Sequence, residues 1–260
     1  MIDAQGFYDG LGEDYDLMVS WADRLAREEP FFLRLFGEAG VTRVLDAACA
    51  TGRHAIAFAL SGREAAGADL SPVMVEAARE NARAAGVSAR FETAGFGALA
   101  ATFGGGYDAV TCLGNSLPHL PDEASLDVCL RDFAALLAPG GRLVIQNRNY
   151  DRLLRERQRF APPVSRRGPE GETLFLRITD FPGPGAPDAE QVEFTIVTLR
   201  YRGSSWSMDT RTTRLRALRR ETLEAALGRA GFTSVRAWGG YDLTPFDSPA
   251  TADLLIVATR

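Results

Sequence analysis

The chain has 260 residues, 46% of them hydrophobic, so it can bury the core of one large domain or of a domain with an added lid. Its formal net charge of −5 argues against a nucleic-acid or anionic-membrane partner, because affinity for phosphates depends on clustered positive charge. The sequence contains no lysine, which excludes a Schiff-base lysine, a Walker-type phosphate lysine and the catalytic lysine of short-chain dehydrogenases.

The cysteines Cys49, Cys112 and Cys129 are odd in number and scattered along the chain. This number and arrangement of cysteines fits a protein of a reducing compartment. The cysteines do not have the spacing of zinc ligands, so we expect no metal site. The first residues lack the basic and apolar regions of a signal peptide, and no apolar run approaches membrane-spanning length. We therefore expect a cytoplasmic protein.

Residues 1–40 predict a flap followed by a helix. Aromatic and acidic residues come first, Tyr8 and Tyr15 among them, and the helix carries further apolar side chains toward the core. Packing into the core explains most of these aromatics, and the alternative is that some of them cover a ligand site. Arg24 lies just ahead of the next segment, where its guanidinium could bind a ligand carboxylate.

Residues 41–69 show the pattern of a strand, a tight turn, a helix and a second strand. The first strand ends at Asp46, small residues lead through Ala48 to Gly52, and the second strand ends at Asp69. Small residues at such a turn let a ligand approach the backbone N–H groups that begin the helix. An acid after the second strand is placed to accept hydrogen bonds from two ribose hydroxyls. The segment therefore predicts a nucleoside site.

A helix is predicted from about Pro72 to Ala85, because Ser71 is a suitable N-cap and proline is favoured in a first turn. The strand predicted over 87–92 leads into a loop with Gly95 and Phe96. Open parallel sheets hold their ligands at such strand ends. Gly95 could offer a backbone N–H and Phe96 an aromatic face to an adenine ring, or Phe96 could be buried beside a turn.

The fourth and fifth strands, predicted over 107–113 and 142–146, both end in polar residues. Asn115 and His119 follow the fourth strand, where a second substrate is expected across from the nucleoside site. Arg148 follows the fifth. Such an arginine either pairs with a neighbouring acid such as Asp151 or binds an anionic substrate.

The pattern changes after Asp151. Alternating segments predict antiparallel strands over 173–179, 191–202 and 206–218, which form a lid or an added sheet. The arginines at 152–167 favour a solvated face over an RNA site, because acidic residues interrupt the run and no aromatics interleave it.

The last two strands are predicted over 234–238 and 254–259. The fold expected is α/β, with a Rossmann-like, seven-stranded, mostly parallel sheet and an inserted antiparallel lid. The expected divisions are an N-terminal helix and flap (1–40), a cofactor-binding core (41–150), a lid (151–218) and the remainder of the core sheet (219–260).

Several of these motifs resemble those of a known family. The string V-L-D-A-A-C-A-T-G at 44–52, Asp69, and P-G-G-R-L-V-I at 139–145 resemble the signature of class I S-adenosylmethionine-dependent methyltransferases over roughly residues 40–150. The strings C-L-G-N-S-L-P-H-L at 112–120 and N-R-N-Y-D at 147–151 resemble those that line the acceptor site of the glycine and sarcosine N-methyltransferases.

The resemblance implies S-adenosylmethionine as cofactor. Asp69 would hold the ribose hydroxyls, the backbone at Ala48 the methionine amine, and Arg24 the methionine carboxylate. The other residues implied to bind the cofactor are Tyr8, Tyr15, Asp46, Gly52, Leu70, Gly95, Phe96, Leu113 and His119. In the catalytic site, Asn115 and Arg148 would bind the carboxylate of an acceptor and Tyr201 would complete the pocket.

The chain departs from the family pattern in two ways. Its glycine-rich loop keeps only Gly52, with Ala48 and Ala50 elsewhere, and two further tyrosines of the glycine-methylating pocket are absent over 165–174 and 214–220. The missing tyrosines point to an acceptor that is larger than glycine or different from it. The resemblance as a whole implies methyl transfer to the amine of a small carboxylate-bearing acceptor, similar to glycine or sarcosine. The alternatives are an amine or hydroxyl of another small molecule, such as a natural product, and a non-catalytic S-adenosylmethionine-binding protein.

A nicotinamide dehydrogenase is disfavoured, because the chain lacks G-x-G-x-x-G and lysine. We expect the protein to act on a small-molecule acceptor that carries a carboxylate. We do not expect it to bind nucleic acid or a membrane. The oligomeric state stays open, with a homo-oligomer among the options.

Overall fold

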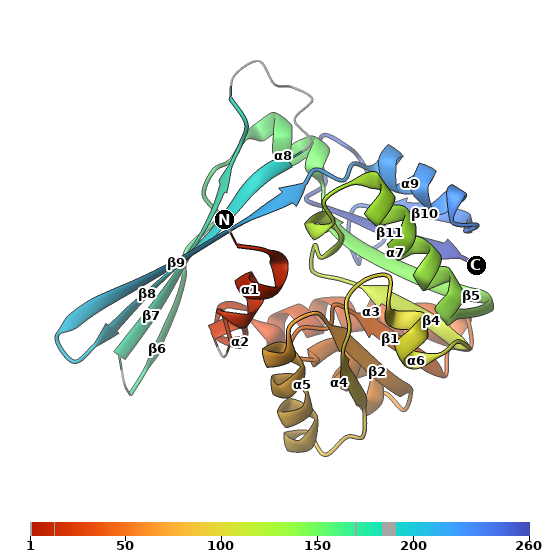
Figure 1. Cartoon of the computed structure of the whole chain (residues 1–260), viewed down its shortest axis with the longest axis horizontal. Coiled ribbons are helices and arrows are strands. Elements are labelled where there is room, and N and C mark those ends of the chain that lie inside the picture. The colour runs from red at the N-terminus through yellow and green to blue at the C-terminus, as the bar shows by residue number, and fades with distance from the viewer. Residues whose placement is uncertain (1, 13, 170, 184–190) are drawn as a thin grey trace.

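The computed structural model describes residues 2–12, 14–169, 171–183 and 191–260. In this part of the chain the central sheet has seven strands in the order β10, β11, β5, β4, β1, β2, β3 (Figure 1). Neighbouring strands from β5 to β3 run parallel, and β11 pairs antiparallel with both β5 and β10. The strands are β1 (Arg43–Ala47), β2 (Glu64–Asp69), β3 (Arg90–Thr93), β4 (Tyr107–Cys112), β5 (Leu137–Arg148), β10 (Thr233–Trp238) and β11 (Asp253–Thr259). The predicted Rossmann-like, mostly parallel sheet is confirmed.

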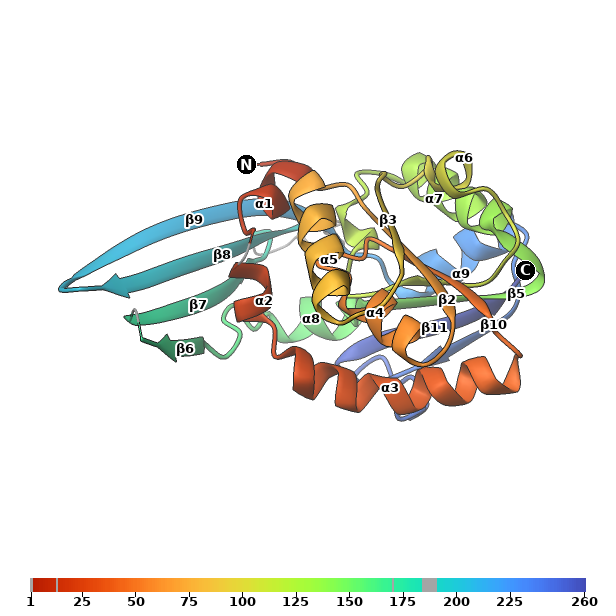
Figure 2. The same ribbon diagram turned by 90° about the horizontal axis from the view of Figure 1, so that it is seen from below.

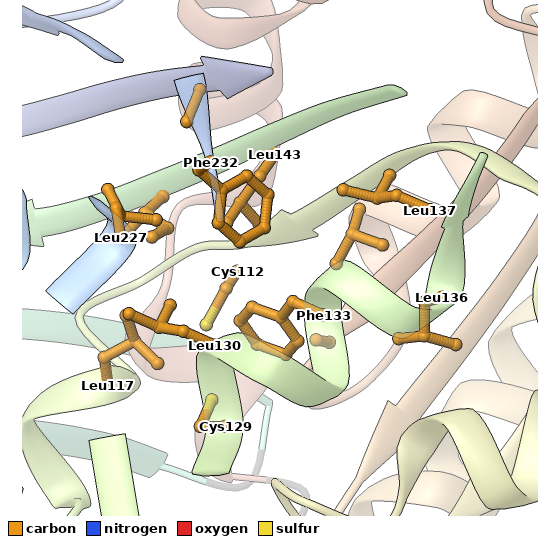
Figure 3. Packing of buried hydrophobic residues seen from close by; sticks show 14 of the residues in the cluster. Cys112, Leu117, Cys129, Leu130, Phe133, Leu136, Leu137, Leu143, Leu227 and Phe232 are labelled. Atoms are coloured by element: carbon orange, nitrogen blue, oxygen red, sulfur yellow. The ribbon is translucent and has the colours of Figure 1, made fainter. Parts of the chain in front are cut away.

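Helices cover both faces of this sheet, and each face has its own apolar core. On one face lie α3 (Trp21–Glu38), α4 (Arg53–Leu60) and α5 (Pro72–Ala84), and on the other α6 (Leu99–Phe103), the short 3-10 helix η1 (Leu117–His119), α7 (Glu123–Leu136) and α9 (Arg220–Arg229). Figure 3 shows the second core, in which Leu130 and Phe133 of α7 pack toward Cys112 and Leu143 of the sheet. Full burial of each such side chain stabilises the fold by about 1.5–3 kcal/mol.

Local signals explain where two of these helices begin. The Ser71 hydroxyl accepts a hydrogen bond from the Met74 N–H at the start of α5, and the Asp122 carboxylate accepts one from the Ser125 N–H at the start of α7. Both starts agree with the sequence patterns. No helix in the described ranges is both long and apolar enough to cross a membrane.

A second, antiparallel sheet projects from the body of the molecule (Figures 1 and 2). It consists of β6 (Val164–Gly168), β7 (Gly171–Asp180), β8 (Gln191–Arg202) and β9 (Ser205–Arg216), and α8 (Tyr150–Glu156) leads into it from β5. The predicted insertion of antiparallel strands is confirmed.

Two short helices, α1 (Ala4–Asp9) and α2 (Asp14–Met18), lie where the two sheets meet (Figure 2). Phe7 of α1 packs in one cluster with Phe175 and Ile196 of the second sheet and with Met74 of α5. The N-terminal segment is therefore held by apolar contacts to both parts of the fold.

The structure differs from the sequence pattern at the start of β5. The turn expected after α7, at Pro139, Gly140 and Gly141, lies inside a strand that already begins at Leu137. Gly140 has a φ of +77°, and the register of β5 against β4 shifts across this stretch. Residues on both sides of the turn pair with β4, so the turn residues form an irregularity within one strand and do not end it.

Candidate active site

A cavity of about 260 Å³ lies at the carboxyl ends of β1, β2 and β4, with α1, α2 and the start of α3 beside it. Every residue predicted to bind the cofactor lines it except Gly52, namely Tyr8, Tyr15, Arg24, Asp46, Ala48, Asp69, Leu70, Gly95, Phe96, Leu113 and His119. These residues come from separate elements, so the fold gathers them at the strand ends where open α/β sheets hold ligands.

Asp69 is a buried carboxylate in the wall of this cavity. Its Oδ2 accepts a hydrogen bond from the Ala50 N–H at 2.8 Å, and its Oδ1 accepts one from the Ser71 N–H at 2.9 Å. Each carboxylate oxygen keeps a further lone pair for a ligand. Burial raises the pKa of Asp69 to about 6 and outweighs these two hydrogen bonds, which favour the charged form.

The turn after β1 brings backbone to the cavity wall. Ala48 and Ala50 line the cavity with φ values of 58° and 47°, in the left-handed region that disfavours a residue with a Cβ by about 1–2 kcal/mol. Alanine therefore occupies positions where glycine would be unstrained.

Gly52 has a packing role, and it is not among the described residues that line the cavity. Its φ is +75°, and a Cβ added to it would lie 2.8 Å from the Ala78 Cβ and 2.9 Å from the ring of Phe91. Only glycine fits without displacing α5 or β3, because the start of α4 is pressed against both.

Asp46, at the carboxyl end of β1, is buried and lines the cavity. Its Oδ1 accepts a hydrogen bond from the Thr111 hydroxyl at 2.7 Å. Burial raises the pKa of Asp46 above its usual value.

Arg24 is held by residues that the sequence pattern did not single out. Its Nε donates to Glu28 Oε1 at 3.0 Å, and its guanidinium stacks over the Trp21 ring at 5.1 Å. His54 Nε2 lies 2.7 Å from Glu28 Oε2. Arg24 and Glu28 are four residues apart, a spacing at which opposite charges pair on a helix, so the sequence could have indicated Glu28. No local sequence pattern indicates His54.

The N-terminal segment is tied down over the cavity by Asp16. Its Oδ1 accepts hydrogen bonds from Trp21 Nε1 at 2.7 Å and from the Thr51 hydroxyl at 2.6 Å. Its Oδ2 accepts from Arg53 at the start of α4. This carboxylate thus joins α2 to the turn after β1.

Tyr8 and His119 meet across the cavity. The Tyr8 hydroxyl and His119 Nε2 are joined by a hydrogen bond of 3.1 Å. Burial lowers the pKa of His119 to about 4, so the imidazole is neutral at pH 7. Burial also raises the pKa of Tyr8, and it raises that of Tyr15 to about 12, so both phenols stay protonated.

Asn115 and Arg148 lie next to each other, but they are not among the described residues that line this cavity. The Asn115 Oδ1 accepts from the Arg148 backbone N–H at 3.0 Å, and its Nδ2 donates to the Tyr150 hydroxyl at 3.1 Å. The flanking Gly114 and Ser116 do line the cavity. Asn115 therefore stands at its edge.

The Arg148 side chain lines a second hollow of about 280 Å³, together with Arg152 and Asp253. The acid expected as its partner, Asp151, instead lies 3.5 Å from Arg219. Within the described ranges Arg148 makes no ion pair within 4.0 Å. Its charge is thus unmatched by a direct carboxylate contact.

Tyr201 lies elsewhere in the molecule. It pairs with Trp206 near the turn between β8 and β9, with ring centroids 5.2 Å apart, at the far end of the second sheet (Figure 1). A strand of twelve residues spans roughly 40 Å, so β8 carries this tyrosine away from the body. Among the described residues, Tyr201 lines neither the main cavity nor the hollow that Arg148 lines.

Comparisons with known proteins show which sequences and folds this chain is similar to. Residues 44–141 match a family model described as a methyltransferase domain. The glycine/sarcosine N-methyltransferase of Halorhodospira halochloris is 36% identical over 148 residues, which cover 57% of this chain and 55% of the relative. The chain thus matches about half the length of the curated relatives.

Two solved structures share the fold over nearly the whole chain. An S-adenosylmethionine-dependent methyltransferase from Clostridium acetobutylicum ATCC 824 is 16% identical, with a TM-score of 0.77 and coverage of 98% of this chain and 97% of that one. The sugar N-methyltransferase KedS8 from Streptoalloteichus sp ATCC 53650 is 24% identical, with a TM-score of 0.74 and coverage of 96% and 94%. Residues 44–141 thus match a methyltransferase domain, and the chain shares its Rossmann-like fold with these two solved methyltransferases.

Proposed function

We propose that the protein is an S-adenosylmethionine-dependent methyltransferase that methylates the amine of a small, carboxylate-bearing acceptor. The observation that carries the proposal is the cavity, where a buried carboxylate, Asp69, and a guanidinium, Arg24, line the same space. A ribose with two hydroxyls matches the first group and an amino-acid carboxylate matches the second. The matched family model and the curated relatives support the same activity.

The residues present fit this cofactor. Asp69 accepts the two ribose hydroxyls, Arg24 binds the methionine carboxylate, and the backbone at Ala48 accepts from the methionine amine. Gly95 and Phe96 frame the adenine. Residues 1–40 act as the cover, since Tyr8 and Tyr15 close the cavity and Asp16 fastens the segment to the turn after β1.

When bound, the cofactor would supply a methyl group activated by its sulfonium sulfur: an amine nitrogen would attack the methyl carbon in line with the C–S bond, which breaks as the N–C bond forms, and the thioether S-adenosylhomocysteine would leave. The chain contributes positioning and exclusion of water. Arg148 and Asn115 hold the acceptor carboxylate at the edge of the cavity. A dedicated base is unnecessary, because a dry site beside a guanidinium favours the neutral form of an amine. His119, which is neutral, holds Tyr8 in place through their hydrogen bond.

Cofactor affinity should depend on pH through Asp69. The charged carboxylate accepts both hydroxyls, and burial places its pKa at about 6. Affinity is then fully present above pH 7 and falls as pH drops through 6, to about one-tenth at pH 5, because only that fraction stays ionised. Titration calorimetry from pH 5 to 8 checks this. Asp69→Asn should bind weakly with a flat profile, and a flat profile in the unchanged protein would contradict the assignment.

Mass spectrometry of products tests the function directly. The protein with S-adenosylmethionine is offered glycine, sarcosine, other amino acids, amino sugars and phenols, and methylated amino acids are expected. Turnover confined to amino sugars or phenols would overturn the acceptor assignment. Cofactor binding without turnover of any compound would indicate a non-catalytic binding protein.

One observation favours a second candidate, an amine on a larger small molecule. Arg148 lines a hollow of about 280 Å³, which is more room than a glycine carboxylate needs. The neighbour described as a sugar N-methyltransferase has the same fold. The same panel of acceptors separates the two candidates by relative kcat/KM.

A further inference from the structure

Glu28 is a charged residue in an unusual place. Its side chain is 2% exposed on α3, a helix whose other buried residues are phenylalanines. Removing a carboxylate from water costs several kcal/mol unless it is paired and hydrogen-bonded. Burial opposes ionisation here, but the hydrogen bond with His54 and the charge of Arg24 together lower the pKa of Glu28 below its usual value. The residue is therefore a buried anion.

The two oxygens of Glu28 have different partners. Oε1 accepts from Arg24 Nε at 3.0 Å and from an Arg27 terminal nitrogen at 3.3 Å, while Oε2 lies 2.7 Å from His54 Nε2. His54 is itself buried, on α4. The carboxylate is thus clamped between two helices, so its own orientation is fixed.

That clamp sets the direction of Arg24. Glu28 takes the Nε edge of the guanidinium, and the Trp21 ring supports its plane. The terminal nitrogens extend to the Gly114 loop, where a Cβ added to Gly114 would lie 3.6 and 3.8 Å from them. Both Arg24 and Gly114 line the cavity. The edge of the guanidinium that can fork onto a carboxylate therefore lies at the cavity wall.

We propose that Glu28 is a positioning residue, which orients Arg24 toward the carboxylate on the amino-acid arm of the cofactor. This inference rests on the proposed function. Glu28 itself does not touch the ligand. It acts by immobilising a long side chain before binding, so that the entropy of ordering that side chain is not lost on binding.

The test compares two ligands that share a nucleoside. S-Adenosylhomocysteine has the amino-acid arm, and 5′-methylthioadenosine lacks it. For Glu28→Gln we expect calorimetry to show about tenfold weaker binding of the first and unchanged binding of the second, since ordering one side chain accounts for a change of this size. Equal loss for both ligands, or loss for neither, would overturn the proposal. If the unchanged protein binds neither ligand, the proposed function fails, and this inference fails with it.

Two further variants make the test specific. Glu38→Gln removes the acid of another pair on the same helix, Arg34 and Glu38 at 3.0 Å, which is exposed, and it should change neither affinity. Arg24→Gln removes the guanidinium that binds the carboxylate of the ligand. Adding Glu28→Gln to this variant should therefore weaken S-adenosylhomocysteine binding no further. An additive second loss would show that Glu28 acts independently of Arg24. If Glu28→Gln does not melt cooperatively, Glu28→Asp replaces it. We expect this variant also to bind S-adenosylhomocysteine more weakly and 5′-methylthioadenosine unchanged.

Discussion

Asp69→Ala is expected to weaken binding of S-adenosylmethionine by roughly 100-fold or more, because two hydrogen bonds to a charged carboxylate contribute about 1.5–3 kcal/mol each. The substitution also leaves the N–H groups of Ala50 and Ser71 without their acceptor. Asp69→Asn is therefore measured beside it, since an amide keeps one acceptor oxygen and nearly the same shape. Calorimetry gives the affinities, and thermal melting shows whether each variant is folded.

Glu80→Gln is the matched control for charge. Glu80 lies on the exposed side of α5, the helix that begins just after Asp69, and its replacement removes one negative charge without touching the cavity. Glu80→Gln should bind S-adenosylmethionine with the affinity of the unchanged protein. A folded Asp69→Ala with unchanged affinity would show that the acid after β2 does not hold the ribose.

Arg148→Ala is expected to raise the KM of the acceptor by about 100-fold and to leave the affinity for S-adenosylmethionine nearly unchanged. A bidentate contact between a guanidinium and a carboxylate is strong and directional, so its loss weakens acceptor binding by about 3 kcal/mol. Cofactor affinity is spared because Arg148 lines the second hollow and not the main cavity. Steady-state kinetics with a carboxylate-bearing amine and calorimetry with the cofactor measure the two effects.

Arg155→Ala serves as the comparison. Arg155 is on α8 and half-exposed, and it lines neither hollow in the part of the chain described by the structure. Its replacement should alter neither KM nor cofactor affinity. If Arg148→Ala weakens acceptor and cofactor equally, Arg148 is a structural residue and the acceptor site lies elsewhere.

Local sequence patterns predicted the elements that build the cavity. The turn between β1 and α4, the acid that ends β2 and the cap at Ser71 each depend on residues close together in the chain, whose conformational preferences act within a few positions. The strand β8, predicted over 191–202, has those bounds in the structure. The sequence also predicted that polar residues from several strand ends lie close together, and they line one cavity, because parallel strands bring their carboxyl ends to one edge of a sheet.

The sequence by itself thus determined the Rossmann-like sheet and which strand ends carry polar groups. Tertiary packing decided the rest. Gly52 is required by Ala78 and Phe91, Arg24 is oriented through Glu28 by His54, and Tyr201 is carried away by the length of a hairpin. The physical reason is distance along the chain: contacts between remote segments depend on how whole helices and strands pack, and that packing leaves no periodic pattern near the residues concerned.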